Sequence, residues 1–432
     1  MTQKFQLQLR LVVMNFLQFA AWGAYLTSMG GYLAKTGHGD IIGWFYSVQG
    51  IVSIFMPALI GMIADRFIRA ERMLGLCHLL AGGFMVAAGL YGVQAGPAYE
   101  PMTLFMLYSL SVAFYMPTLA LSNSAAFTAL QKAGMDTVKD FPPIRVFGTV
   151  GFICTMISVD LMGYQHTPVQ FVISGAISLL LAFYAPTLPA CPVKPKGEGA
   201  SLAESLGLNA FKLFRNKRMA IFFIFSFLLG LQLQISNGFA NGFISSFDRI
   251  AEFKDAYFAS HANLLISLSQ LSETCCILLI PFFMKRFGIK RVMLIAMGAW
   301  VLRFGLFGVG NPAIPGVLFF ILSCIVYGVA FDFFNISGAL FVNQNTDESI
   351  RSSAQGLFML MTNGLGAFFG SLWAQAIVSH FVPNTPQAEE MPILTDDLAQ
   401  QLMGGWQTTW FIFAAYALVV FILFWLIFKE KK

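Results

Sequence analysis

Long runs of apolar residues dominate the chain, and short clusters of charged residues separate them. A membrane-spanning helix needs roughly 20 predominantly apolar residues. The runs have that length and lack the strict alternation of a membrane β-barrel strand. Twelve runs qualify, and they are 9–34, 42–64, 73–95, 101–127, 143–163, 168–189, 218–246, 258–284, 291–310, 314–343, 352–381 and 405–428. The pattern predicts an all-α integral membrane protein with twelve transmembrane helices.

The composition agrees with a chain whose main solvent is lipid. Of its 432 residues, 57% are hydrophobic and only 11% are charged. A typical soluble domain has about 25% charged residues. So few charges cannot cover the surface of a soluble protein of this length, which favours the membrane class.

Lys and Arg residues gather in alternate loops. With both termini placed in the cytoplasm, 22 of the 26 Lys and Arg residues fall in inner segments. The outer loops hold only Lys35, Arg249 and Lys254. Cytoplasmic loops of membrane proteins are enriched in Lys and Arg. We therefore expect an even number of spans and cytoplasmic termini.

A polar stretch divides the spans into two groups of six. Its first part is rich in Pro, Lys and Gly, as expected of a linker. We predict an N-terminal six-helix bundle over 1–189, a cytoplasmic linker over 190–217 and a C-terminal six-helix bundle over 218–432. Many secondary transporters are duplicated bundles that bind their substrate near the bilayer midplane.

The loop between the second and third spans, GMIADRFIRAER, resembles the signature loop of the major facilitator superfamily. Gly61, Asp65, Arg66 and Arg69 match that pattern, whereas Ile68 stands where glycine is usual. A weak second copy, PFFMKRFGIKR, lies between the eighth and ninth spans. In the superfamily this loop braces one conformation, so the resemblance implies a conformational switch. The alternative is that its charges only anchor the helix ends.

Two carboxylates lie near the centres of predicted spans, at Glu273 and Asp332. A charge at the centre of a span costs about 2.5–3.5 kcal/mol on insertion scales. That cost indicates an interior cavity, and burial favours the neutral carboxyl form, so both are candidates for proton coupling. The alternative is a pair of structural acids neutralised by Arg145 or Arg303. Asp160, near the outer end of its span, is interpreted as a solvated helix end.

Polar and aromatic side chains recur at helical spacing on four of the spans. Residues three or four positions apart share one face of a helix. The candidates for a ligand site are, span by span, Arg145, Thr149 and Phe152, then Gln234 and Asn237, then Gln270 and Glu273, then Tyr327, Phe331 and Asp332. Amides can read a base edge or sugar hydroxyls, and aromatic rings can stack on a planar ring. Intramembrane amides also join helices to each other, which is the alternative for any one of them.

Several long stretches closely resemble the nucleoside:proton symporter family of the major facilitator superfamily. Among them are DFPPIRVFGTVGF (140–152), SQLSET (269–274) and VYGVAFDFFNISGALFV (326–342). The likeness covers nearly the whole chain and is strongest to the broad-specificity nucleoside permeases of bacteria. It implies that the ten candidates line a nucleoside pocket between the two bundles, and that Glu273 and Asp332 couple transport to protons.

We therefore expect a nucleoside:proton symporter that works by alternating access and imports nucleosides such as uridine or adenosine. We expect a monomer surrounded by membrane lipid, with no cofactor, no metal and no nucleic-acid partner. A sugar:proton symporter of the same superfamily is the nearest alternative. A channel or receptor fits less well, because lone midspan acids and a duplicated bundle favour alternating access. An enzyme is not expected, since the five histidines are scattered and no HExxH or nucleophile motif occurs.

Overall fold

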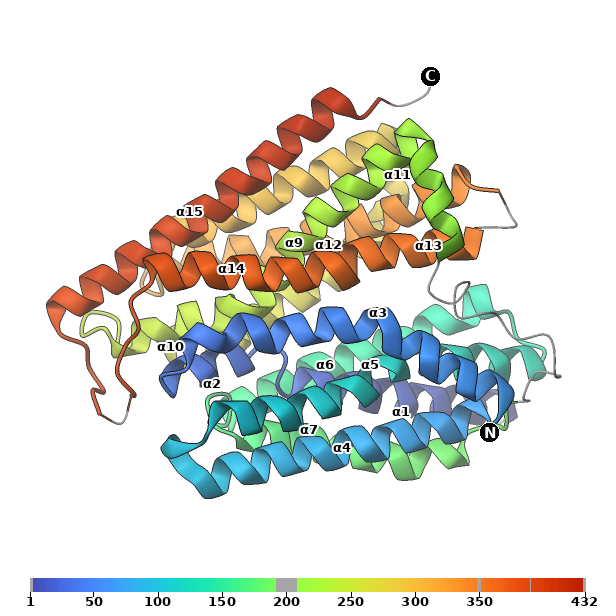
Figure 1. Ribbon diagram of the computed structural model, residues 1–432, viewed down its shortest axis with the longest axis horizontal. Coiled ribbons are helices and arrows are strands. Elements are labelled where there is room, and N and C mark those ends of the chain that lie inside the picture. The colour runs from blue at the N-terminus through green and yellow to red at the C-terminus, as the bar shows by residue number, and fades with distance from the viewer. Residues whose placement is uncertain (1–2, 192–207, 348–350, 389, 430–432) are drawn as a thin grey trace. The chain divides into compact units, whose positions relative to one another are not determined.

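The computed structural model describes residues 3–191, 208–347, 351–388 and 390–429. Within these ranges the regular structure is helical and contains no strand (Figure 1). The elements are α1 (Gln3–Gly23), α2 (Met29–Lys35), η1 (Gly39–Ile41), α3 (Ile42–Arg66), α4 (Ala70–Ala95), η2 (Gly96–Ala98), α5 (Pro101–Lys132), α6 (Thr137–Leu161), α7 (Val169–Tyr184), η3 (Ala185–Thr187), η4 (Leu208–Arg215), α9 (Lys217–Ser246), η5 (Phe247–Arg249), α10 (Tyr257–Ser260), α11 (Ala262–Val309), α12 (Val317–Gln344), α13 (Arg351–Met359), η7 (Leu360–Gly366), α14 (Ala367–Phe381) and α15 (Asp396–Ile427).

Ten helical segments in the described ranges are long and apolar enough to cross a membrane. They cover the second to twelfth predicted spans, because α11 contains both the eighth and the ninth. Gly288, with φ 77° and ψ 170°, interrupts the helical backbone of α11 where the sequence predicts a loop. The first predicted span, 9–34, is broken into α1 and α2. The all-α, multi-pass fold class is therefore confirmed.

Contacts divide the chain into two compact units, whose limits differ from those of the predicted bundles. The first unit is Met1–Leu26 with Ile51–Ser205, and the second is Thr27–Gly50 with Leu206–Lys432. The second unit thus contains a segment, 27–50, that the sequence assigns to the N-terminal bundle. Most of the predicted linker, 192–207, lies outside the described residues. The division into six plus six helices along the chain stays a prediction.

In the first unit, α1 packs closely on α6. A Cβ atom at Gly151 would lie 2.3 Å from the backbone oxygen of Phe16, and one at Gly23 would lie 2.3 Å from that of Phe152. Such small residues let membrane helices approach closely. The contact fixes the face of α6 that carries Phe152.

A buried polar network joins four helices of the first unit. His78 on α4 contacts Ser178 Oγ on α7 through Nδ1 and Gln18 Oε1 on α1 through Nε2, both at 2.8 Å. Gln18 Nε2 in turn donates to Thr118 Oγ1 on α5 at 2.7 Å. Buried polar groups need such partners, because an unpaired one carries its full desolvation cost. The network therefore holds these helices in one register.

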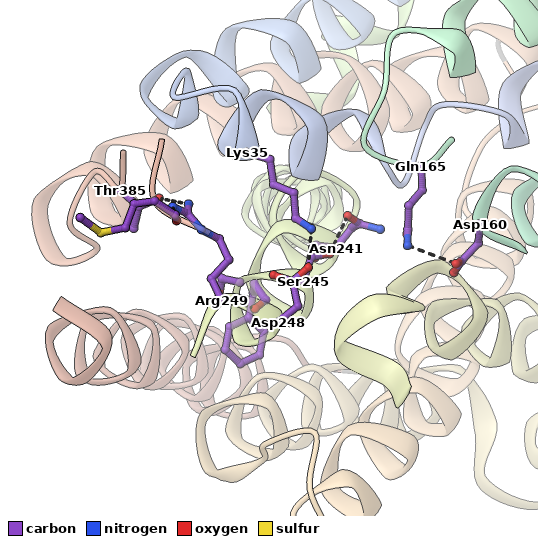
Figure 2. Close-up of polar contacts among 11 residues, drawn as sticks. Lys35, Asp160, Gln165, Asn241, Ser245, Asp248, Arg249 and Thr385 are labelled. Carbon is purple, nitrogen blue, oxygen red and sulfur yellow. Dashed lines mark hydrogen bonds and ion pairs between the residues drawn. The ribbon is translucent and has the colours of Figure 1, made fainter. Parts of the chain in front are cut away.

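Asp160 corrects an expectation from the sequence. Its side chain is 1% exposed, so the interpretation as a solvated helix end is wrong. The chain turns back after α6 at Gly163, which has a φ of 76°. This turn brings Gln165 onto the carboxylate, and Gln165 Nε2 donates to Asp160 Oδ1 at 3.1 Å (Figure 2). The Asp160 carboxylate therefore accepts a hydrogen bond from an amide side chain, where the sequence suggested contact with solvent.

In the second unit, segment 27–50 begins with close contacts to α9 and α11. Thr27 Oγ1 donates to Asn263 Oδ1 at 2.9 Å. A Cβ atom at Gly30 would lie 2.0 Å from the backbone oxygen of Gly238, so the two backbones touch there. These contacts explain why the segment belongs to this unit, although it lies far from α9 in the sequence.

Two further contacts hold segment 27–50 in the second unit. The Gln375 side chain on α14 accepts from the Gly43 amide at 2.7 Å and donates to the Gly39 carbonyl at 2.9 Å. Lys35 Nζ forms an ion pair with Asp248 Oδ2 at 2.5 Å (Figure 2). By accepting from the Gly43 amide, the Gln375 side chain satisfies one of the N–H groups that the start of α3 leaves unpaired.

The loop before α15 is attached to η5 by one arginine. The Arg249 guanidinium donates to Thr385 Oγ1 at 3.0 Å, to the Pro386 carbonyl at 2.9 Å and to the Met391 carbonyl at 2.7 Å (Figure 2). The amide of Leu394 donates to the Arg249 carbonyl at 2.8 Å. Arg249 is therefore a structural anchor of this loop.

Candidate functional site

The two midspan carboxylates lie on helices whose backbones touch. A Cβ atom at Gly328 on α12 would lie 2.6 Å from the carbonyl carbon and oxygen of Ser272 on α11, and 2.7 Å from the amide nitrogen of Glu273. The Ser272 hydroxyl also donates to the Ile325 carbonyl. Glycine at 328 thus lets α11 and α12 meet where Glu273 and the segment leading to Asp332 lie.

Asp332 is a buried carboxyl group with one unsatisfied oxygen. Its side chain is 5% exposed, and Oδ2 has no hydrogen-bond partner among the described residues. Glu273 lies close enough to interact with it electrostatically. Within the same ranges no ion pair joins Asp332 to Arg303, so the structure does not support neutralisation of Asp332 by that arginine. A buried, unpaired carboxylate is costly, and taking up a proton removes the cost.

Aromatic side chains pack beside the carboxylates. Tyr327 stacks on Phe331 with ring centroids 5.7 Å apart and planes 12° apart, which confirms that they share a face of α12. Trp300 meets Tyr327 edge to face at 5.9 Å. The Arg303 Cζ lies 4.3 Å from the centroid of the Tyr327 ring. Tyr327 is only 4% exposed, so the half-buried Phe331 ring is the more accessible member of this stack.

Amide side chains lie on the neighbouring helices of the same unit. Asn237 Nδ2 donates to Gln234 Oε1 at 3.1 Å, which confirms that the two share one face of α9. Both side chains are half-buried, as is Gln270 on α11. Primary amides carry both donors and acceptors, so they can pair with either kind of group on a ligand.

A small, partly open pocket lies in the second unit beside the aromatic stack. Its lining residues are Leu229, Gly230, Leu233, Trp300, Ala330, Phe331, Phe334, Asn335 and Thr362. Phe331 is the only predicted site residue in this lining. Trp300 and Thr362 were not predicted, because neither stands at helical spacing from a candidate acid or amide. Asn335 had such a signal, since it follows Asp332 by three positions on α12.

The first unit presents its own group of predicted site residues on α6. The Arg145 guanidinium lies over the Phe19 ring, with Cζ 3.8 Å from the centroid. Phe152 is buried and meets Trp22 edge to face at 6.5 Å. Thr149, between them along α6, is half-buried. The geometry offers a positive charge, a hydroxyl and an aromatic ring within one stretch of helix.

The predicted switch loop is short in the structure. Helix α3 ends at Arg66 and α4 begins at Ala70, with Arg69 exposed between them. The side chains of Asp65 and Arg66 lie outside what the structure describes. A Cβ atom at Gly61 would meet no atom within 4 Å. The role of this loop stays a prediction.

The chemistry available in both units is protonation, hydrogen bonding and ring stacking. Among the side chains that the structure describes, no group of three or more His, Cys, Asp or Glu could hold a metal ion.

Membrane-spanning helices that bury carboxyl groups are typical of proteins with ion or proton pathways, a class that includes the secondary transporters. Residues 5–432 match the family model described as nucleoside H+ symporter. The chain belongs to this family, as the sequence predicted.

Two relatives and one solved structure agree with this assignment. The xanthosine permease of Escherichia coli K12 is 46% identical over 423 residues, which cover 98% of this chain and 96% of the relative. The nucleoside permease NupG of the same strain is 44% identical over 427 residues, with the same shares covered. A crystal structure of a NupG variant matches at a TM-score of 0.89 and 42% identity, covering 98% of this chain and 100% of that chain. These relatives are permeases, which agrees with the prediction that the chain is not an enzyme.

Proposed function

We propose that this chain imports nucleosides together with protons across the bacterial inner membrane. Membership of the nucleoside H+ symporter family is the basis of the proposal. The observation that carries the coupling is the buried Asp332 carboxyl group, whose Oδ2 has no partner in the described ranges. A group that is costly as an anion and stable as an acid is suited to carry a proton.

We assign proton coupling to Glu273 and Asp332. When access is from outside, a carboxylate takes up a proton and the nucleoside binds. The neutral acid lowers the cost of closing the cavity around it, and both cargoes leave once access is from inside. Each proton that enters under a potential of 100 mV supplies about 2.3 kcal/mol. Binding alone only equilibrates the nucleoside, so accumulation needs this coupling.

The substrate contacts follow from the chemistry of the side chains. Tyr327 and Phe331 are stacked and give a planar base an apolar surface. The amides of Gln234, Asn237 and Gln270 suit base edges and ribose hydroxyls. On α6 we assign substrate contacts to Arg145, Thr149 and Phe152 as well, on the basis of the family resemblance.

The remaining parts of the proposal concern topology and partners. The Lys and Arg distribution supports cytoplasmic termini. We also propose that the protein acts as a monomer in lipid, and that Gly61, Asp65, Arg66 and Arg69 form a conformational switch. Uridine and adenosine are the proposed substrates.

Uptake into proteoliposomes tests the function. Purified full-length protein is reconstituted, and labelled uridine, adenosine and xanthosine are offered with and without an inwardly directed proton gradient. We expect the gradient to concentrate nucleosides and a protonophore to abolish accumulation. Unlabelled nucleosides should compete for uptake, whereas sugars should not. Competition by a sugar alone would instead support the sugar:proton alternative.

A further inference from the structure

Arg303 on α11 is buried, and its guanidinium joins three stretches of helix. The side chain is 1% exposed. Its Nε donates to Ser236 Oγ on α9 at 3.0 Å, and its Nη1 donates to the Ser323 carbonyl on α12 at 2.8 Å. Nη1 also approaches Ser269 Oγ, earlier on α11, at 3.4 Å. The Ser323 hydroxyl returns a bond to the Arg303 carbonyl at 2.9 Å.

These contact points adjoin the proposed pocket residues. Each serine that Arg303 contacts lies close in the sequence to a residue proposed to line the pocket. Ser236 directly precedes Asn237, Ser269 directly precedes Gln270, and Ser323 lies one helical turn before Tyr327. Because neighbouring residues on a helix move together, a shift of the guanidinium would displace all three. Arg303 itself was not among the candidates for the ligand site.

The same guanidinium fixes an aromatic ring of the pocket. Its Cζ lies 4.3 Å from the Tyr327 centroid and 5.2 Å from the Phe307 centroid. Tyr327 in turn stacks on Phe331. A cation over an aromatic face is held most strongly when it is desolvated, as it is here.

Joining helices through a buried arginine costs more free energy than joining them through apolar side chains. Burial of a charge carries a large desolvation cost, and an apolar side chain of similar size often packs as well or better. In the described ranges no carboxylate pairs with Arg303. Three oxygen acceptors and two rings compensate the charge instead, and only a planar fork of donors can reach all of them.

We propose that Arg303 is a positioning residue of the nucleoside pocket, which holds the Tyr327 ring and the adjoining turns of α9, α11 and α12 in their binding arrangement. It acts through Tyr327, Ser236 and Ser269 rather than by touching the nucleoside. The inference rests on the proposed nucleoside transport, and it assigns Arg303 a positioning role in that transport.

The test measures initial rates of labelled uridine uptake by the full-length protein in proteoliposomes at a fixed proton gradient. We expect Arg303→Gln to raise KM about 10-fold or more and to change the maximal rate far less. Arg303→Lys should give an intermediate KM, because lysine keeps the charge over the ring and loses the fork. Tyr327→Leu should raise KM, and adding Arg303→Gln to it should raise KM little further.

Arg218→Gln is the matched control. Arg218 belongs to the same unit, has its Cζ 4.9 Å from the Phe341 centroid and donates to Asn345 Oδ1 at 3.0 Å. Within the described ranges, its hydrogen bond and its ring contacts involve none of the proposed pocket residues. The control should lower the thermal unfolding midpoint and leave the KM for uridine at the wild-type value.

The pH profile separates positioning from a direct effect on the acids. Tyr327 lies within electrostatic reach of Arg303, Glu273 and Asp332. A positioning role predicts that the Arg303 variants keep the wild-type dependence of uptake on pH. A displaced profile, or an unchanged KM in folded Arg303→Gln protein, would overturn the inference. If Arg303→Gln does not fold, Arg303→Lys must still show a raised KM. Failure of the wild type to take up uridine would instead refute the proposed function.

Discussion

The contact between α11 and α12 at Gly328 makes a quantitative prediction. In Gly328→Ala the new Cβ would lie 2.6 Å from Ser272 backbone atoms, where ordinary contacts begin at 3.4 Å. Backbone atoms cannot rotate away as side chains do, so the helices must separate locally by about 0.8 Å. Overpacking of this kind costs about 1–3 kcal/mol. Alanine regains about 0.5–1 kcal/mol of that as the better helix former, which leaves a net loss of about 0–2.5 kcal/mol.

Transport should suffer more than stability does. The shift falls on the turn that carries Glu273, next to the stacked Tyr327 ring. Misplacement of reacting groups by 1 Å can cost a factor of about 100 in rate. Because the expected displacement is close to 1 Å, we expect Gly328→Ala to reduce proton-driven uridine uptake by about 10-fold or more. The assay is initial-rate uptake in proteoliposomes, with a thermal unfolding curve of the same purified protein.

Gly305→Ala is the control for this experiment. Gly305 lies on the same helix, α11, and a Cβ there would meet no atom within 4 Å. Its replacement should leave uptake unchanged and raise stability slightly. Wild-type KM and maximal rate in Gly328→Ala, with unfolding equal to that of Gly305→Ala, would show that the helices do not need their close contact.

Three other experiments test the acids and the second unit. Asp332→Asn should abolish concentrative uptake of nucleoside at neutral pH, and unchanged accumulation would refute its role as proton carrier. Glu273→Gln should impair accumulation of nucleoside. Nucleoside exchange measured without a gradient then distinguishes the two possible causes, because preserved exchange means that proton coupling is lost while binding remains. The Lys35–Asp248 pair has side chains 22% and 19% exposed, so a double-mutant cycle on the unfolding free energy should give a coupling of about 0.2–1 kcal/mol. Exchanging the two charges should restore most of that coupling, and a value of several kcal/mol would contradict this estimate.

Sequence spacing predicted the local geometry of the candidate site well. Gln234 and Asn237, three positions apart, are hydrogen-bonded on one face of α9. Tyr327 and Phe331, four apart, are stacked on α12. The α-helix fixes such short-range relations by its period alone, so they need no knowledge of the tertiary fold.

Relations between distant segments were not predictable in this way. Nothing in the spacing of Ser236, Ser269 and Ser323 marks them as partners of one arginine. Gly328 looks like any other glycine in an apolar run until its contact with Ser272 is known. Segment 27–50 was assigned by its place in the chain, whereas its contacts join it to the second unit. Each of these depends on which helix faces meet, and a single sequence does not specify that.

The two buried aspartates show why burial alone does not identify a proton carrier. Asp160 is 1% exposed and Asp332 is 5% exposed, so burial ranks Asp160 first. Asp160, however, accepts a hydrogen bond from Gln165, which stabilises a carboxylate in place. Asp332 Oδ2 has no such partner in the described ranges, and Glu273 lies within electrostatic reach of it. These differences in partners, rather than in depth, are the reason why we propose Asp332 and not Asp160 as the proton carrier.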